Sequence, residues 1–212
     1  MRNRWLAPGL ILAMLVVGFA VYGQLPAQVP SHWNINGQVD GTMSRLASVL
    51  FLPGLNVLIW LAMLALPRID PLRQSYPAFQ GTLRLFINVI VLFMAILYVA
   101  MLGVALGWPI EVPRVIMFCV GILFAVLGNE LGRLKPNWFV GIRTPWTLAD
   151  PEVWRSTHRV GGRVFVVVGL AILVAGLLLP VNVSIYVVLA GALSIVLFSF
   201  GYSYLRWRQH IA

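Results

Sequence analysis

Six long apolar stretches constrain this chain more than any other feature of its sequence. A helix needs about 20 mostly apolar residues to cross the roughly 30 Å of hydrocarbon in a bilayer. Stretches of about this length lie at residues 5–23, 46–66, 85–107, 115–132, 164–180 and 183–205. The fourth is the weakest, because it must accept Glu130 near one end and Arg114 at the other. The pattern predicts an all-α, polytopic membrane protein of about six transmembrane helices.

The composition agrees with this interpretation. Of the 212 residues, 60% are hydrophobic and 10% are charged, whereas a soluble domain carries about 25% charged residues. The sequence contains no hydrophilic linker long enough to separate a soluble domain. We therefore expect a single membrane domain over residues 1–212, with an ordered outer loop at 24–45 and a long interfacial inner loop at 129–163.

The distribution of positive charge predicts the orientation. The net charge is +9, and thirteen of the 15 Lys and Arg residues fall on one side of the six expected helices. Only Arg45 and Arg114 fall on the other side. By the positive-inside rule, the thirteen cations and both termini face the cytoplasm. Because these cations lie between apolar stretches, they indicate contact with membrane lipid and not with nucleic acid.

The first stretch has two interpretations. Arg2 and Arg4, an apolar core and the small residue Gly23 also fit a cleaved signal peptide. A retained helix is favoured, because nineteen residues is long for a signal core. Cleavage would leave five membrane-spanning helices.

The outer loop, QLPAQVPSHWNINGQVDGTMSR, places polar groups around one tryptophan between prolines and glycines. Prolines and turn-forming glycines are typical of an ordered loop. Its candidate ligand-binding residues are Pro30, His32, Trp33, Asn34, Gly37 and Asp40. Alternatively, the tryptophan anchors at the lipid headgroups and the polar groups close Asx turns. No metal or other cofactor is predicted, since the loop offers two zinc ligands at most and zinc usually needs three or four.

The inner loop contains six of the thirteen cations, interleaved with aromatic residues, which is typical of a segment at headgroup depth. Residues 141–145 should be bent and not helical, because Thr144 precedes a proline. Asp150 and Pro151 should begin a short helix that ends at the glycines 161 and 162. The candidate residues for binding a partner or a headgroup are Asn129, Glu130, Lys135, Pro136, Asn137, Trp138, Gly141, Arg143, Thr144, Pro145, Trp146, Trp154, Thr157, His158 and Arg159.

Glu130, in the inner loop, has two possible roles. A carboxylate at the end of a membrane helix normally has a partner or a task. One interpretation is a structural ion pair with Arg133 or Arg143 that attaches the loop to the fourth helix. The other is a polar site of Glu130, His158 and Arg143 that is open from the cytoplasm to a proton, a headgroup or a peptide.

Polar residues within the expected helices are few. Pro53 with Gly54 should kink the second helix, and Asn56 and Asn88 should bond neighbouring helices, although a transport path is the alternative. Motifs of hydrolytic enzymes, such as HExxH or a phosphate-cradling loop, are missing. We therefore expect a protein that is not an enzyme.

Three segments resemble the SdpI family of bacterial membrane proteins. They are LPAQVPSHWNINGQVDG (Leu25–Gly41), GNELGRLKPNWFVGIRTPWTL (Gly128–Leu148) and VWRSTHRVGG (Val153–Gly162). The first is similar to a short N-terminal domain of unknown function found in that family. The resemblance implies a multi-pass protein of the bacterial cytoplasmic (inner) membrane.

The resemblance also implies a function. The best-known member gives a producing cell immunity to its own secreted, membrane-active peptide toxin, and it also signals by holding a cytoplasmic repressor at the membrane. By this resemblance, the outer loop would meet a peptide toxin and the inner loop a cytoplasmic regulator. A transporter for a small molecule, a lipid or a proton is the alternative function.

Overall fold

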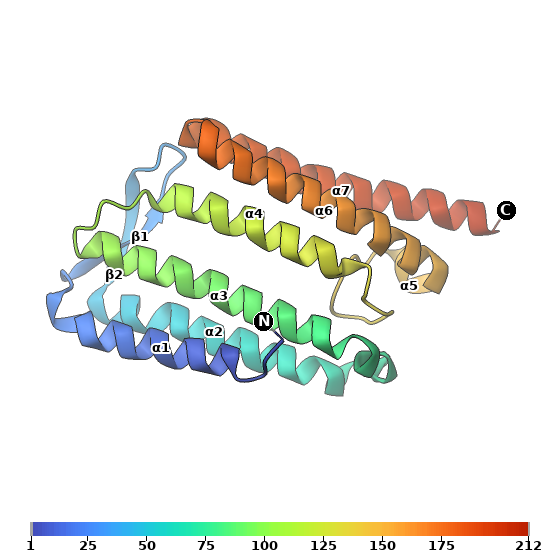
Figure 1. Cartoon of the computed structure of the whole chain (residues 1–212), viewed down its shortest axis with the longest axis horizontal. Helices are drawn as coiled ribbons and strands as arrows, with labels where there is room; N and C mark the ends of the chain where they lie inside the picture. Colours follow the sequence, from blue (N-terminus) through green and yellow to red (C-terminus); the bar gives the residue numbers. More distant parts are fainter. Residues whose placement is uncertain (1, 212) are drawn as a thin grey trace.

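The secondary structure is almost entirely helical. The computed structural model describes residues 2–211, shown in Figure 1. Its helices and strands are α1 (Leu6–Val21), β1 (Gln28–Trp33), β2 (Val39–Ser44), α2 (Arg45–Ile69), α3 (Gln80–Ala105), α4 (Val112–Leu131), α5 (Pro145–Ala149), α6 (Pro151–Leu178) and α7 (Val181–Ile211). Short 3-10 turns follow α1 at Tyr22–Gln24 and precede α3 at Arg73–Phe79.

Six helical segments within residues 2–211 are long and apolar enough to cross a membrane. They correspond to the six apolar stretches, so the predicted all-α, polytopic membrane fold is confirmed. The starting residues differ most for α3 and α6, which begin at Gln80 and Pro151, before the apolar stretches themselves begin. Helical hydrogen bonding therefore continues into the polar residues that flank the apolar stretches.

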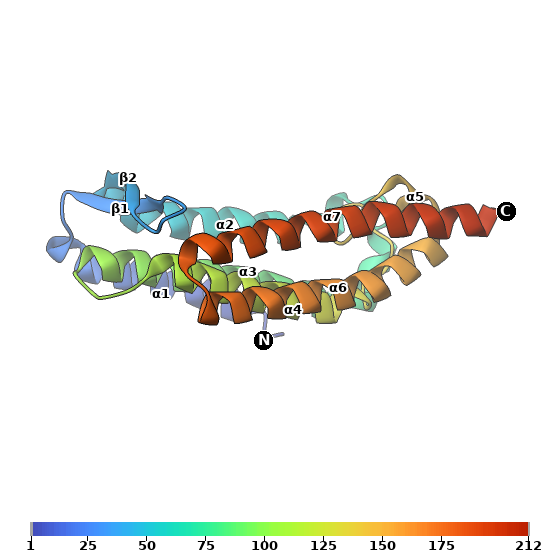
Figure 2. The same cartoon turned by 90° about the horizontal axis from the view of Figure 1, so that it is seen from above.

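The helices form a row with one further helix packed on each half. α1, α3, α4 and α6 contact one another in that order. α2 packs on α1 and α3, and α7 packs on α6 and α4; Figure 2 shows both helices over the same face of the row. The tight turn between α6 and α7 is held by the hydroxyl of Ser184, which donates to the carbonyl of Ala175 at 2.9 Å.

The bundle has two ends, which are named here by their loops. We call the end with β1, β2 and the α6–α7 turn the hairpin end (Figure 1). The other end, with α5 and residues 132–150, is called the basic end. Each end has its own buried apolar cluster, around Leu25, Val29 and Tyr98 at the hairpin end and around Phe79, Leu134 and Trp154 at the basic end.

The prediction that Gly161 and Gly162 end a short helix is wrong. α6 runs without a break from Pro151 to Leu178. Gly162 lies against Gly128 of α4, where an added Cβ on Gly128 would come within 2.6 Å of the Gly162 carbonyl oxygen. An added Cβ on Gly169, seven residues further, would come within 2.5 Å of the Gly121 carbonyl oxygen. These glycines allow the backbones of two membrane helices to approach closely, which compensates for their low helix propensity.

The asparagines within the helices hold neighbouring segments. Asn56 of α2 donates to the sulfur of Met14 in α1 at 3.2 Å, as a helix-to-helix contact. Asn88 of α3 donates at 2.8 Å to the carbonyl of Asn3, which lies before α1. α2 continues through Pro53 without a break in its assignment, so the predicted kink stays a prediction.

Candidate functional site

The outer loop folds as a β-hairpin, a difference from the expected loop of turns. β1 and β2 pair antiparallel, with Pro30 opposite Thr42, and Val29 is fully buried against the helices. At the tip, the side-chain oxygen of Asn34 accepts from the backbone N–H of Asn36 at 2.9 Å and of Gln38 at 3.0 Å. This bears out the Asx-turn interpretation for Asn34.

The candidate polar residues on the hairpin face solvent. His32 and Asp40 come from opposite strands, and their Nδ1 and Oδ1 atoms lie 2.5 Å apart. The side chains are 71% and 43% exposed, respectively. Both groups therefore lie where an approaching ligand could contact them.

A groove of about 430 Å³ lies beside the hairpin tip. Trp33 and Gly37 line one side, while Pro113 and Arg114 of α4 and Val181 of α7 line the other. Gly37 has a positive φ of 78°, and an added Cβ there would lie 3.5 Å from a side-chain carbon of Pro113. The hairpin thus meets the start of α4 and α7, in the other half of the bundle.

Arg114 fixes that other wall of the groove. It forms an ion pair with Glu111, one turn earlier. It also donates to the carbonyl oxygen of Gly176 in α6 at 2.9 Å. The positive charge is therefore satisfied on two sides before any ligand enters.

At the basic end, Asn137 is fully buried and closes the loop before α5. Its side-chain oxygen accepts from the N–H groups of Phe139 and Val140 at 2.9 and 2.6 Å, and its amide donates to the carbonyl of Lys135 at 2.9 Å. An amide can make these bonds in both directions at once, which a hydrophobic side chain cannot. Asn137 therefore acts as a structural residue of this loop.

Trp154 and His158 lie four residues apart on one face of α6, and their rings are stacked. Their ring centroids lie 4.0 Å apart, and each side chain is 1% exposed. The indole N–H of Trp154 donates to the carbonyl of Leu134 at 3.1 Å. His158 Nε2 accepts from the N–H of Ile142 at 2.9 Å, so its proton is on Nδ1, which donates to the carbonyl of Trp154 at 2.8 Å. The neutral imidazole of His158 thus connects α6 to the loop through two hydrogen bonds.

The approach of the loop to this histidine requires a glycine. Gly141 has a φ of 115°, and an added Cβ would come within 2.4 Å of His158 Nε2. An L side chain at this position would be strained and would collide with the ring. The segment 141–144 is not helical, as predicted, but the prediction is wrong for Pro145, where α5 begins.

Thr144 caps α5 and also connects it to α7. It forms a reciprocal capping box with Thr147. Its hydroxyl donates to the hydroxyl of Ser203 in α7 at 2.9 Å. Trp146 packs on the ring of Tyr204 in α7, with 5.2 Å between the centroids. The inner loop is therefore attached to both α6 and α7.

Glu130 is held by three side chains within the described part of the chain. Arg133 donates to it at 2.8 Å, which confirms one predicted partner. Arg2 lies 3.1 Å from the carboxylate, and the hydroxyl of Thr82 donates to it at 2.9 Å. Sequence reasoning missed both, because they are far from Glu130 in the chain. The carboxylate joins α3, α4 and the segment before α1.

The site expected from Glu130, His158 and Arg143 together is not what the structure shows. Arg143 was an expected partner of Glu130, but it donates to the carbonyl of Trp138 at 2.9 Å. His158 bonds to the backbone of residues 142 and 154. The three side chains have separate partners, because the bent loop carries Arg143 toward solvent.

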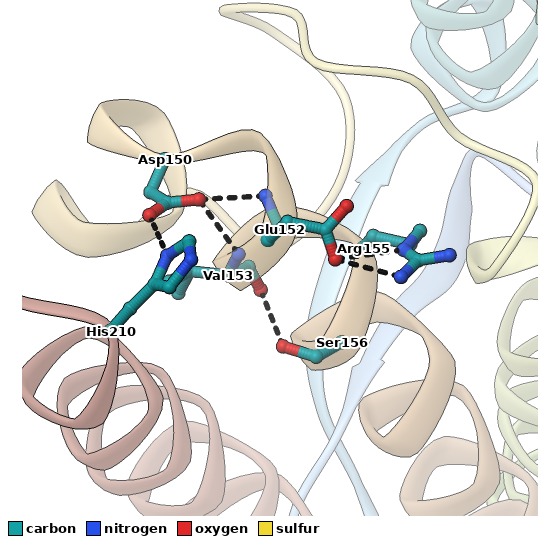
Figure 3. A network of polar contacts seen from close by, with 6 residues as sticks. All are labelled: Asp150, Glu152, Val153, Arg155, Ser156 and His210. Atoms are coloured by element: carbon teal, nitrogen blue, oxygen red, sulfur yellow. Dashed lines mark hydrogen bonds and ion pairs between the residues drawn. The ribbon is translucent and has the colours of Figure 1, made fainter.

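Asp150 begins α6, as predicted, and also holds the end of α7 (Figure 3). One carboxylate oxygen accepts from the N–H groups of Glu152 and Val153 at 2.7 and 3.2 Å, and the other lies 2.5 Å from Nδ1 of His210. Partial burial would raise the pKa of this carboxyl, but the bonds from His210 and the two N–H groups outweigh it and leave the pKa below the ordinary value.

The inner-loop candidates divide by exposure. Those that are buried are Glu130, Asn137, Thr144, Trp154, Thr157 and His158. Those that are exposed are Asn129, Lys135, Trp138, Arg143, Pro145 and Arg159. Pro136, Gly141 and Trp146 are half-buried. The exposed set can meet a partner or a headgroup directly, whereas the buried set can act only through the fold.

Known protein families match this chain in two regions, one that includes the hairpin and one that includes most of the inner loop. The model of the SdpI/YfhL protein family matches residues 133–203, and that of a domain of unknown function, DUF1648, matches residues 9–57. The chain is 26% identical over 165 residues to the immunity protein SdpI of Bacillus subtilis (strain 168), covering 78% of this chain and 77% of that protein. No solved structure matches the chain significantly. The chain is therefore similar to the SdpI/YfhL family over residues 133–203, and its six helices long and apolar enough to span a membrane are those of a multi-pass membrane protein.

Proposed function

We propose that this chain is a non-enzymatic membrane protein that gives immunity to, or senses, a secreted membrane-active peptide. The similarity to an immunity protein supports this function. The observation that carries it is the hairpin end, where an ordered hairpin exposes His32 and Asp40 and places Trp33 in the wall of a groove.

The proposal includes an orientation. The hairpin end faces outward, and the basic end and both termini face the cytoplasm, in the bacterial inner membrane. The excess of Lys and Arg at the basic end supports this arrangement through the positive-inside rule. A secreted peptide then meets the hairpin end first.

The chemistry of the hairpin end fits an amphipathic peptide. His32 and Asp40 offer hydrogen bonds, and Trp33 lines the groove. Ile35 and Trp108 are 41% and 54% exposed at the same end. Aromatic anchors beside polar groups are the usual composition of peptide-binding surfaces. We expect the peptide to contact this face before it can disrupt the bilayer.

The proposal for the basic end is a docking surface for a cytoplasmic regulator. Lys135, Trp138, Arg143 and Arg159 are exposed there on a scaffold of buried hydrogen bonds. A rigid scaffold that presents Arg and Trp is suited to binding another protein. Glu130 supports this end as a structural ion cluster rather than as a transport site.

The test is protection of living cells. Cells that express the chain are exposed to a panel of membrane-active peptides, and Trp33→Ala and Arg143→Ala are compared with wild type at matched membrane levels. Trp5→Ala and Arg208→Gln are the matched controls, because both residues are exposed, neither lines the groove and neither belongs to residues 129–163. We expect Trp33→Ala to lose protection and the controls to keep it.

The Arg143→Ala variant distinguishes immunity from signalling. If Arg143→Ala still protects cells but fails to recruit a cytoplasmic protein to the membrane, the basic end carries only the signalling step. Equal killing of cells with and without the wild-type chain, across the panel, would contradict the proposal. Substrate flux in proteoliposomes would then test the transporter function.

A further inference from the structure

A cavity of about 380 Å³ lies between α2, α3 and the segment before α1. Trp60 and Leu64 of α2 and Leu83 and Ile87 of α3 form an apolar wall. The cavity lies away from the hairpin groove, and neither candidate site described above uses it.

Three arginines border this cavity: Arg4 before α1, Arg68 at the end of α2 and Arg84 in the first turns of α3. No carboxylate is among the lining residues. Within residues 2–211, none of the three takes part in an ion pair. The nearest bond of Arg68 is a long one of 3.4 Å to the carbonyl of Leu64, in its own helix.

Within residues 2–211, every acidic side chain has a partner other than these arginines. The six acidic side chains are engaged elsewhere, namely Asp40 with His32, Asp70 with Tyr76, Glu111 with Arg114, Glu130 with Arg2 and Arg133, Asp150 with His210 and Glu152 with Arg155. In the described part of the chain, three guanidinium groups at the rim of an apolar cavity therefore form a positive site without an ion pair, in which only Arg4 lies over an aromatic ring, that of Trp5, at 5.1 Å. Guanidinium groups bind phosphate oxygens through paired, charge-assisted hydrogen bonds.

The position of the site matches the depth of lipid headgroups. Arg68 lies one residue before the end of α2, and Arg84 lies four residues after the start of α3. Arginines at the ends of spanning helices lie where the phosphates of the bilayer are found. The apolar wall continues from this level toward the middle of the helices through Trp60 and Ile87.

From this geometry we infer that the cavity binds one anionic phospholipid. Its phosphate lies among Arg4, Arg68 and Arg84, and an acyl chain lies along the wall formed by Trp60, Leu64 and Leu83. A basic pocket between membrane helices is a recognised form of specific lipid site. The lipid would fill the space between α2 and α3 and neutralise their charges.

The test is native mass spectrometry of the full chain in detergent, titrated with phosphatidylglycerol or with phosphatidylcholine of the same acyl chains. The double variant Arg68→Gln/Arg84→Gln should bind phosphatidylglycerol about tenfold more weakly, because two charge-assisted contacts are lost. Arg206→Gln/Arg208→Gln removes the same charge from α7 and should bind as wild type does. Leu64→Trp keeps the arginines but narrows the apolar wall, and it should also weaken binding.

Several results would overturn the inference. One is equal binding of phosphatidylglycerol by the cavity variant and the α7 variant at matched unfolding temperatures. Another is equal binding of the two lipids by wild type. Displacement of phosphatidylglycerol by inorganic phosphate, with no effect of Leu64→Trp, would assign the site to a soluble anion. Because the assay uses no toxin, its outcome does not depend on the proposed immunity function.

Discussion

The two ends of the bundle use similar residues at opposite degrees of burial. Each has an Asn that closes a turn, a His that makes a hydrogen bond and a Trp beside it. The side chain of His32 is 71% exposed at the hairpin end, whereas His158 is 1% exposed at the basic end. An identical residue type can therefore meet a ligand at one end and only support the fold at the other.

This difference in burial separates residues that stabilise the fold from residues that are free to contact a ligand. At the basic end, Asn137, Trp154 and His158 satisfy buried backbone groups, which would be costly to leave unpaired. At the hairpin end, His32 and Asp40 satisfy no buried group in the described structure. The comparison predicts large stability effects at the basic end and small ones at the hairpin end.

The largest effect is expected for Trp154→Ala. Removing a fully buried indole that stacks on His158 should lower the free energy of unfolding by about 3–5 kcal/mol. Unfolding in detergent, followed by tryptophan-independent circular dichroism, measures this. Trp5→Ala is the matched control, since Trp5 is 67% exposed; equal effects of the two substitutions would refute the structural role of the basic end.

The second effect concerns Glu130→Gln. The substitution removes the charge from a carboxylate that bonds Arg2, Arg133 and Thr82, and should cost about 2 kcal/mol of unfolding free energy. Glu152→Gln is the control, because that carboxylate pairs only with the exposed Arg155 and should cost less than about 1 kcal/mol. If protection collapsed while the unfolding free energy was unchanged, Glu130 would belong to a functional site instead.

The third effect is pH-dependent. Asp150→Ala should cost about 1 kcal/mol at neutral pH, because it removes the N-cap of α6 and the bond to His210. The pKa of this carboxyl is below its ordinary value in the folded chain. Its contribution is therefore complete above the ordinary value of about 4 and disappears as the pH falls through the lowered value. The unfolding free energies of wild type and variant should therefore converge in acid. A difference that stayed constant with pH would show that the ionised carboxylate of Asp150 does not contribute to stability.

The sequence predicted the spans, the order of the two loops, the bend at Thr144 and the cap at Asp150, because these depend on hydropathy and local backbone chemistry. It did not predict contacts between distant segments. The pairing of Glu130 with Arg2 joins positions 128 residues apart. The close approach of Gly162 to Gly128 is visible only in three dimensions, so the sequence alone wrongly predicts a helix end at Gly162. The burial of His158 likewise depends on where the bent loop packs.

The smallest stability effect, and the sharpest test of the comparison, is expected for His32→Ala. The exposed pair with Asp40 should contribute less than about 0.5 kcal/mol to the free energy of unfolding. Protection against the peptide should nevertheless fall, because the substitution removes a hydrogen-bonding group from the face that the peptide meets. Asp40→Asn is the companion variant. It removes the charge of the partner of His32 and keeps the size of its side chain, so it distinguishes a loss of charge from a loss of side-chain volume.

If His32→Ala destabilised the chain as much as His158→Ala does, the hairpin end would be a scaffold like the basic end. The ligand site would then have to lie among the exposed residues of the basic end, where Arg143 and Trp138 are the first to replace.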